Sequence, residues 1–171
     1  MKFARTVLDG CFVIEIEKKT DSRGFFARTF DKKIFGCEFV QDSISFNRKR
    51  GTIRGLHFQK HPHEEAKLVR CTMGSIFDVV ADPRPESSTY GKWFGTILSA
   101  KNHRMILIPK GLAHGFQTLE DNTEVNYQIT EYHNPTSATG IKYNSFGIKW
   151  PVQNPIVSRK DMLNISLTNS K

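Results

Sequence analysis

The sequence predicts an all-β protein with one or two short helices, folded as a β-sandwich or barrel. Apolar and polar residues alternate with a period of two along several segments, and clusters of turn-forming residues separate these segments at short intervals. Helical periodicity is scarce. The 171 residues fit a single domain, which we expect to span 1–171 with a core from about 10 to 163.

Five segments carry the strand signal. Phe12, Ile14 and Ile16 fall on one face of a predicted strand, and four more segments are rich in β-forming residues: 75–80, 93–98, 105–108 and 124–129. Turn signals occur at 21–24, 82–85, 120–122 and 133–135. Short strands at this spacing are typical of a sandwich or barrel.

Two short helices interrupt this pattern. Asp31 is suited to cap a helix that runs through Phe35, and either Ser158 or Asp161 is suited to begin another near the end of the chain. The last residues, 164–171, form a polar segment that we expect to be poorly ordered.

Composition argues against several classes of protein. The hydrophobic content of 38% and charged content of 25% are typical of soluble globular proteins. The apolar runs are too short to span a membrane, and the first residues lack the apolar stretch of a signal peptide. The 3 cysteines, Cys11, Cys37 and Cys71, are scattered, so we expect free thiols in the cytoplasm rather than a disulfide framework.

The net charge of +8 raises the question of an anionic partner. The one dense basic run is Arg48-Lys49-Arg50, and the other basic residues are spread along the chain instead of forming a stripe with aromatic neighbours. We therefore expect no nucleic-acid partner. A small anionic substrate such as a diphosphate would use arginine side chains equally well, because guanidinium groups match phosphate oxygens.

One segment keeps the spacing of a metal site without its full set of ligands. Gly55, His61 and His63 reproduce the first motif of the cupin superfamily, which this part of the chain resembles. In that superfamily a glutamate three or four residues after the second histidine completes a metal site, and here the position falls on Lys67 or Leu68. Because an ammonium group does not bind a divalent cation, we expect no metal and no cofactor.

A longer series of motifs runs from Asp21 to Asp161. The most specific is Arg54-Gly55-Leu56-His57-Phe58-Gln59. The others are Asp21-x-Arg23-Gly24-x-Phe26, Phe39-Val40-Gln41-Asp42, Ala66-Lys67-Leu68-Val69, Gly74-x-Ile76-Phe77-Asp78-Val79, Gly91-Lys92-Trp93, Pro109-x-Gly111-x-Ala113-His114-Gly115-Phe116 and Gly147-Ile148-x-Trp150-Pro151. Together they resemble the dTDP-4-dehydrorhamnose 3,5-epimerase family of RmlC-like cupins. The resemblance implies a metal-independent, cupin-type jelly-roll β-barrel that forms a homodimer.

The chemistry of such an enzyme sets requirements that this sequence meets. Inverting a carbon next to a ketone needs a base to remove the α-proton, stabilisation of the enolate, and a proton donor on the opposite face. The resemblance implies His57 as the base, with Asp161 as the carboxylate that orients it. It further implies that Lys67 holds the developing oxyanion and that Tyr127 is the acid.

The resemblance also implies a set of substrate contacts: Arg23, Phe26, Arg28, Gln41, Ser43, Arg54, His114 and His133. Three of these depart from the family pattern, with Arg28 in place of a glutamate, Ser43 in place of an asparagine and His133 in place of a tyrosine. An arginine offers two donors to O6 and N7 of guanine, whereas it cannot accept the N3–H of thymine. We therefore expect weakened selectivity for dTDP and a preference for GDP-linked 4-keto sugars, including heptoses.

These observations lead to one expected function and three alternatives. We expect an epimerase that inverts C3, C5 or both in a GDP- or dTDP-linked 4-keto sugar, for surface polysaccharides such as lipopolysaccharide or capsule. The first alternative is a cupin 3,4-ketoisomerase of a nucleotide sugar. The second is a metal-dependent cupin oxygenase or isomerase that uses His61, His63 and His114, and the third is a non-catalytic module that binds polyanions.

Overall fold

The computed structural model describes residues 1–167. Most of the regular structure within them is β-strand, with two α-helices of four residues each and a single 3-10 turn. The elements are β1 (Lys2–Arg5), β2 (Phe12–Glu15), β3 (Lys19–Asp21), β4 (Gly24–Phe26), α1 (Lys32–Phe35), β5 (Gln41–Asn47), β6 (Thr52–Gln59), β7 (Lys67–Met73), β8 (Ser75–Ala81), β9 (Trp93–Ser99), β10 (Met105–Ile108), β11 (Ala113–Thr118), β12 (Thr123–Ile129), β13 (Ala138–Gly140), η1 (Ser145–Gly147), β14 (Ile156–Val157) and α2 (Arg159–Met162).

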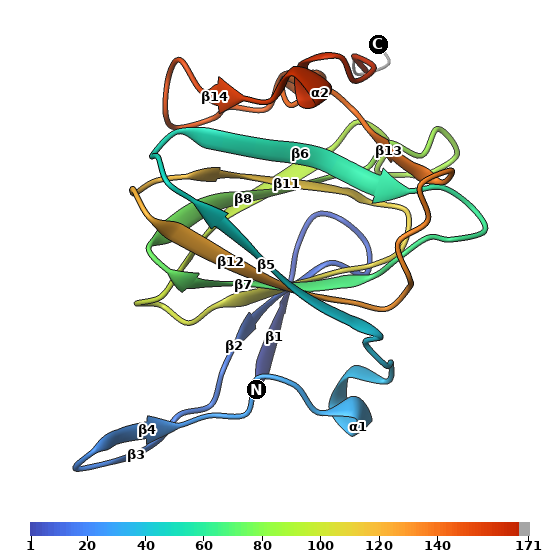
Figure 1. Cartoon of the computed structure of the whole chain (residues 1–171). Coiled ribbons are helices and arrows are strands. Elements are labelled where there is room, and N and C mark those ends of the chain that lie inside the picture. Colours follow the sequence, from blue (N-terminus) through green and yellow to red (C-terminus); the bar gives the residue numbers. More distant parts are fainter. Residues whose placement is uncertain (168–171) are drawn as a thin grey trace.

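The strands form two six-stranded sheets that face each other, as Figure 1 shows. The first sheet has the order β1-β2-β10-β7-β12-β5, and the second has the order β13-β6-β11-β8-β9, with β14 paired in parallel to β6. The all-β prediction is confirmed. Four predicted strand segments coincide with β8, β9, β10 and β12 to within one residue at each end.

The space between the sheets is filled by an apolar core at one end. Along β7, Val69 and Cys71 point inward together with Lys67, whereas Leu68 belongs to a cluster on the outer face, as the two-residue period of a strand requires. Burial of each large apolar side chain in such a core contributes about 1.5–3 kcal/mol. Tyr127 packs against this core at its boundary with a polar cavity.

The outer face of the second sheet is covered by the C-terminal segment of the chain. The C-terminal segment packs Ile141, Phe146 and Ile148 against the second sheet. Ile165 forms a bridge with Ile141. The prediction of a poorly ordered tail is therefore wrong for 164–167, because this segment pairs with the barrel, and the rest of it lies outside the described residues.

Both predicted helices are present, and each begins at a capping residue. The carboxylate of Asp31 accepts a hydrogen bond from the Lys33 backbone N–H, and α1 ends at Gly36, which has a φ of 67°. Ser158 caps α2 in the same way, since its hydroxyl accepts a hydrogen bond from the Asp161 backbone N–H at 3.1 Å.

A β-bulge in β6 determines which side chains face the space between the sheets. His57 lies opposite His114 and Arg54 lies opposite Phe116, so three steps along β6 match two steps along β11. The extra residue brings Arg54 and His57 to the same face. The two strands approach closely here, because a Cβ on Gly55 would lie 2.6 Å from the Gly115 Cα.

The hairpin of β3 and β4 extends away from both sheets (Figure 1). Every residue of its two strands is exposed, and the Phe26 side chain is 67% exposed. Phe25 makes an edge-to-face contact with His103 at 5.0 Å between ring centroids, and Lys18 lies over the Phe25 ring. A two-stranded hairpin with so few contacts gains little stability from its own chain.

Candidate active site

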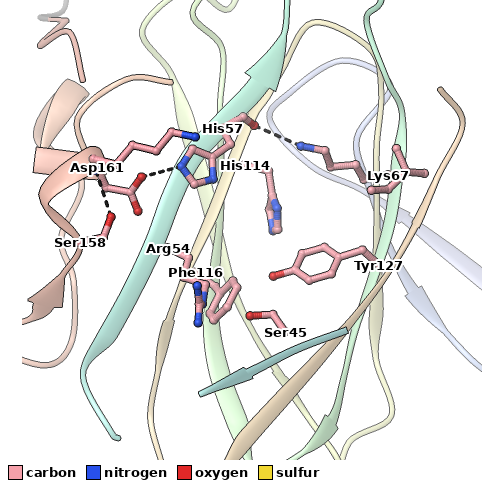
Figure 2. Close-up of a pocket in the computed structure, with 11 residues that line it drawn as sticks. Ser45, Arg54, His57, Lys67, His114, Phe116, Tyr127, Ser158 and Asp161 are labelled. Atoms are coloured by element: carbon pink, nitrogen blue, oxygen red, sulfur yellow. Dashed lines mark hydrogen bonds and ion pairs between the residues drawn. The ribbon is translucent and has the colours of Figure 1, made fainter. Parts of the chain in front are cut away.

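A cavity of about 430 Å³ opens between the two sheets next to the apolar core. Residues of both sheets and of α2 line it: Ser45, Arg54, His57, Lys67, His114, Phe116, Tyr127, Ile129, Ser158, Lys160 and Asp161. Figure 2 shows the polar side chains of facing strands converging on this space. The cavity therefore brings together the four predicted catalytic residues and two of the predicted substrate contacts.

His57 and Asp161 form a hydrogen-bonded pair. The Nε2 of His57 lies 2.7 Å from Oδ1 of Asp161, whose side chain is almost completely buried. The other oxygen of Asp161 accepts the backbone N–H of Gly55 at 3.3 Å. Because a carboxylate only accepts hydrogen bonds, Nε2 carries the proton of the neutral imidazole, and Nδ1 is left to accept a proton.

The surroundings of His57 favour its neutral form. Burial lowers the pKa of His57 below its ordinary value of 6.5, and the positive charges of Lys67 and Lys160 act in the same direction. The hydrogen bond and charge of Asp161 oppose this effect without reversing it. His57 is thus ready to remove a proton at neutral pH.

Lys67 reaches the cavity from the first residue of β7. Its Nζ donates to the backbone carbonyl of His57 at 3.2 Å and lies 3.0 Å from Oε1 of Glu65. Both side chains of this ion pair are buried. Figure 2 shows the Lys67 ammonium beside the His57 backbone at the rim of the cavity.

Tyr127 lies on β12, in the sheet that faces His57. Figure 2 shows its hydroxyl pointing into the space bounded by Arg54, His114 and Ser45. Burial raises the pKa of Tyr127 well above its ordinary value of 10.0, and the charge of Asp78 adds to this effect. The phenol therefore keeps its proton across the neutral range and is suited to donate it.

A second histidine–carboxylate pair lies deeper in the cavity wall. The Nε2 of His114 is 2.8 Å from Oδ2 of Asp78, and both side chains are buried. The ring of His114 makes an edge-to-face contact with Tyr127 at 6.0 Å between centroids. This pair fixes one side of the space that Tyr127 faces.

Cationic groups give the cavity a preference for anionic ligands. Arg54 lines the cavity and also an adjoining surface groove that contains Arg48 and Lys49. The Nε of Arg54 donates to the Asn47 side-chain oxygen at 2.7 Å, which directs the guanidinium along this path. Arginine in this setting suits phosphate oxygens.

Six of the predicted substrate contacts do not line this cavity within the chain. Arg23 and Phe26 lie on the exposed hairpin, and Arg23 pairs with Asp21 at 2.6 Å. Arg28 follows the hairpin and lies 3.3 Å from Asp31.

The other three, Gln41, Ser43 and His133, lie near one end of β5. Ser43 is exposed opposite Tyr127, on the edge strand of the first sheet. The Gln41 side chain accepts the backbone N–H of His133 at 3.0 Å, and His133 lines a smaller pocket beside the cavity. The roles predicted for these six residues thus need a ligand or partner that extends beyond the cavity.

Sequence reasoning missed five residues that line the cavity: Ser45, Phe116, Ile129, Ser158 and Lys160. Two of them carry a signal in hindsight. Ile129 lies two residues from Tyr127 and therefore shares its face of β12, and Lys160 precedes Asp161 in the first turn of α2. Ser45 and Phe116 follow from the register of β5 and β11, which the sequence does not specify.

The histidines of the predicted metal pattern are not assembled around one point. His61 is highly exposed and lies 3.4 Å from Glu64. Among residues 1–167, no group of three or more His, Cys, Asp or Glu side chains has a geometry that could hold a metal ion. No helix in the same part of the chain is long and apolar enough to cross a membrane.

The arrangement provides the three elements of α-proton chemistry at a carbonyl. A neutral imidazole and a protonated phenol come from facing sheets, and an ammonium group lies beside the backbone carbonyl of His57. A base on one side, an acid on the other and a cation for the intermediate oxygen are the groups that inversion through an enolate requires.

Comparison with known proteins identifies a family that this chain matches. Residues 5–169 match the family model described as dTDP-4-dehydrorhamnose 3,5-epimerase. A protein of that name from Methanothermobacter thermautotrophicus is 46% identical over 170 residues, which cover 94% of this chain and 91% of the relative.

Solved structures of the same family superpose closely. A dTDP-4-dehydrorhamnose 3,5-epimerase from Bacillus anthracis with TDP and PPi bound has a TM-score of 0.93 and 42% identity, covering 97% of this chain and 99% of that one. An RmlC enzyme from Legionella pneumophila in complex with dTDP-4-keto-L-rhamnose has a TM-score of 0.89 and 36% identity, covering 96% and 92%. The predicted cupin-type jelly-roll fold is confirmed by this likeness.

Proposed function

This chain belongs to the dTDP-4-dehydrorhamnose 3,5-epimerase family, and we propose that it inverts C3 and C5 of a dTDP-linked 4-keto-6-deoxy sugar. Membership makes it a carbohydrate epimerase of the isomerase class. The observation that carries the proposal is the convergence of His57, Lys67 and Tyr127 in one cavity, with Asp161 paired to His57.

The proposed reaction proceeds through an enolate. Nδ1 of His57 takes the proton from the carbon next to the ketone, the C–H electron pair moves into the carbon–carbon bond, and the ketone oxygen becomes an oxyanion. The imidazolium that forms is stabilised by Asp161, and the oxyanion by the ammonium of Lys67. Tyr127 then gives its proton to the same carbon from the opposite face, and the oxyanion collapses back to the ketone.

We propose dTDP as the nucleotide and not GDP. The expectation of GDP depended on Arg28, which pairs with Asp31 and lies outside the cavity of its own chain, so the choice of nucleotide rests on the relatives. The relatives are named for dTDP sugars, and one solved relative has TDP bound. Calorimetric titration with dTDP, GDP, UDP and CDP tests the choice. We expect dTDP to bind at least tenfold more tightly than the others, and equal or tighter binding of GDP would overturn it.

We propose a homodimer in which the hairpin of one copy reaches the cavity of the other. Two features support it: the exposed hairpin that carries Arg23 and Phe26, and the edge strand β5, on which Ile44 and Phe46 are exposed. Exposed apolar edges of this kind are normally covered. Light scattering at micromolar concentration should give twice the mass of the chain, and a monomer would contradict the proposal.

We propose that the enzyme works in the cytoplasm without a metal, on a sugar destined for surface polysaccharide. All three cysteines are free thiols, as a reducing compartment favours. Dialysis against a chelator should leave the rate of epimerisation unchanged, and a loss that added metal restores would contradict metal independence.

Proton exchange with solvent tests the proposed function directly. Incubation with dTDP-4-keto-6-deoxyglucose in deuterium oxide should incorporate deuterium at C3 and C5, and NMR should give the inverted product. No exchange at either carbon would overturn the proposal. A product with its carbonyl at C3 would favour the 3,4-ketoisomerase alternative instead.

A further inference from the structure

Glu65 stands next to the catalytic machinery without lining the cavity. It lines a smaller pocket of about 360 Å³ beside the cavity, together with Gln59, His133 and Asn164. From there one carboxylate oxygen reaches Lys67. A group in this place affects the reaction only through the residue that it holds.

We propose that Glu65 is a positioning residue that orients Lys67 towards the substrate oxyanion, an inference that rests on the proposed function. The donors of the Lys67 ammonium group support this role. An ammonium group has three N–H bonds in fixed tetrahedral directions. The Nζ of Lys67 donates to the His57 carbonyl at 3.2 Å and forms an ion pair with Oε1 of Glu65 at 3.0 Å. The carbonyl and the carboxylate hold the ammonium in place beside the cavity that Lys67 lines, where its remaining donor capacity is available to a ligand.

The backbone makes this geometry rigid. Glu65 lies two residues before Lys67, just outside the start of β7, and the two side chains meet at 3.0 Å. Ala66, between them, is held on both of its backbone groups: its N–H donates to the Thr130 hydroxyl at 2.9 Å, and its carbonyl accepts the Thr130 backbone N–H at 3.1 Å. These bonds fix the backbone on which both side chains of the ion pair are mounted.

The burial of the Glu65 carboxylate indicates a role other than stabilising the fold. The Glu65 side chain is 5% exposed and that of Lys67 is 10% exposed. The second oxygen of Glu65, Oε2, has no hydrogen-bond partner among residues 1–167. A buried carboxylate that is only half satisfied is a poor device for stability, since an apolar or amide side chain avoids the desolvation cost. Such a group is expected where a cation must be held in one orientation.

Steady-state kinetics with three variants of Glu65 test the proposal. Glu65→Gln keeps the shape and one acceptor but removes the charge, and we expect kcat to fall about tenfold with the dTDP dissociation constant within twofold of wild type. Glu65→Asp keeps the charge but shortens its reach, and we expect a similar fall. Glu65→Ala should lose more than either. A wild-type kcat in both the Gln and the Asp variants would overturn the proposal, and Glu64→Gln, which removes a neighbouring charge that pairs with His61, is the matched control.

A double-mutant cycle separates positioning from a general effect on the barrel. Lys67→Met should lower kcat by about 10²–10³-fold, the effect of losing one oxyanion-stabilising donor. In the Lys67→Met background, Glu65→Gln should change kcat by less than twofold, because Glu65 acts only through Lys67. A further tenfold fall in that background would show that Glu65 supports the fold and would overturn the proposal.

The failure of this inference is distinguishable from failure of the proposed function. If wild type exchanges no α-protons, the function is wrong. If wild type is active and Lys67→Met is equally active, the role of Lys67 is wrong, and that of Glu65 falls with it. If Lys67→Met is impaired and Glu65→Gln and Glu65→Asp are not, only the positioning role is wrong.

Discussion

The cavity and the β3–β4 hairpin differ in how far apart in the sequence their interacting residues lie. In the cavity, His57, Lys67 and Tyr127 come from three strands and two sheets, and Asp161 arrives from a helix more than a hundred residues later. On the hairpin, Arg23 pairs with Asp21 of the same turn and Phe26 is exposed. The groups that we propose as catalytic are fixed by the fold of one chain, whereas the hairpin groups are not.

This difference separates chemistry from recognition. The polar groups in the cavity hold one another: Asp161 bonds His57, and Lys67 bonds the His57 backbone. The hairpin residues are held by their own turn and make few contacts with the barrel. Changes in the cavity should therefore affect the rate of chemistry, and changes in the hairpin should affect substrate binding.

The largest effect is expected for the base. His57→Asn should lower kcat by about 10²–10⁴-fold and abolish deuterium incorporation, because the variant lacks the proposed base. The melting temperature and the mass by light scattering should stay near wild type. His61→Asn, at an exposed position outside the cavity, is the matched control and should remain active. More than a tenth of wild-type activity in His57→Asn would contradict the assignment.

Tyr127→Phe should have a more selective effect. The substitution keeps the ring that packs against Phe116 and His114 but removes the proton donor. Net inversion should fall about 10²-fold, at the low end for a general acid, while exchange of the α-proton at the first carbon continues. NMR of the recovered sugar in deuterium oxide measures both quantities. An equal loss of exchange and inversion would mean that Tyr127 orients the substrate and does not protonate it.

Arg23→Ala tests the hairpin side of the comparison. We expect KM to rise about tenfold, with kcat within twofold of wild type. A tenfold fall in kcat with KM unchanged would place the residue in the chemistry and break the distinction. Lys19→Ala, on the same hairpin, is the matched control.

Mixed dimers sharpen this prediction. A dimer of one His57→Asn chain and one Arg23→Ala chain contains one complete site, because the intact hairpin of the first chain serves the intact cavity of the second. Equal co-expression should therefore restore about a quarter of all sites. Assays at substrate concentrations below the wild-type KM should detect it. No recovery above the sum of the two separate variants would exclude a hairpin that acts across the dimer.

The sequence predicted the first region better than the second for a physical reason. Local patterns predict local structure: the β-forming residues of 93–98 predicted β9, Asp31 predicted the start of α1, and Ser158 was one of two predicted starts for α2. The motif around His57 marked the cavity through family resemblance. The hairpin was also found as a turn signal, but where its side chains act depends on contacts that a single chain does not contain.

The sequence could not predict the strand register for a different reason. Arg54 and His57 are three residues apart, so a regular strand would put them on opposite faces. The bulge in β6 brings them together, and it depends on the close packing of Gly55 against Gly115, sixty residues along the chain. Gly55 inside a strand pattern is a sign of such a bulge, but it does not say which partner strand produces it. Ser45 and Phe116 were missed because they reach the cavity through the register of β5 and β11.

The smallest effect is expected from the pH dependence of the base. His57 acts as a base only when neutral, so kcat/KM should be lost as pH falls through its pKa, and burial holds that pKa below 6.5. Lys160 lines the cavity, and its charge contributes to lowering the pKa of His57. Lys160→Met should therefore move the acid limb of the kcat/KM profile to higher pH, while kcat at pH 8 stays within twofold of wild type. Lys149→Met removes the same charge from an exposed position outside the cavity and should leave the limb in place. In Lys160→Met, the acid limb could instead stay in place or move to lower pH. Either result would mean that a group other than His57 controls the limb, and that His57 is not the base whose titration limits the reaction.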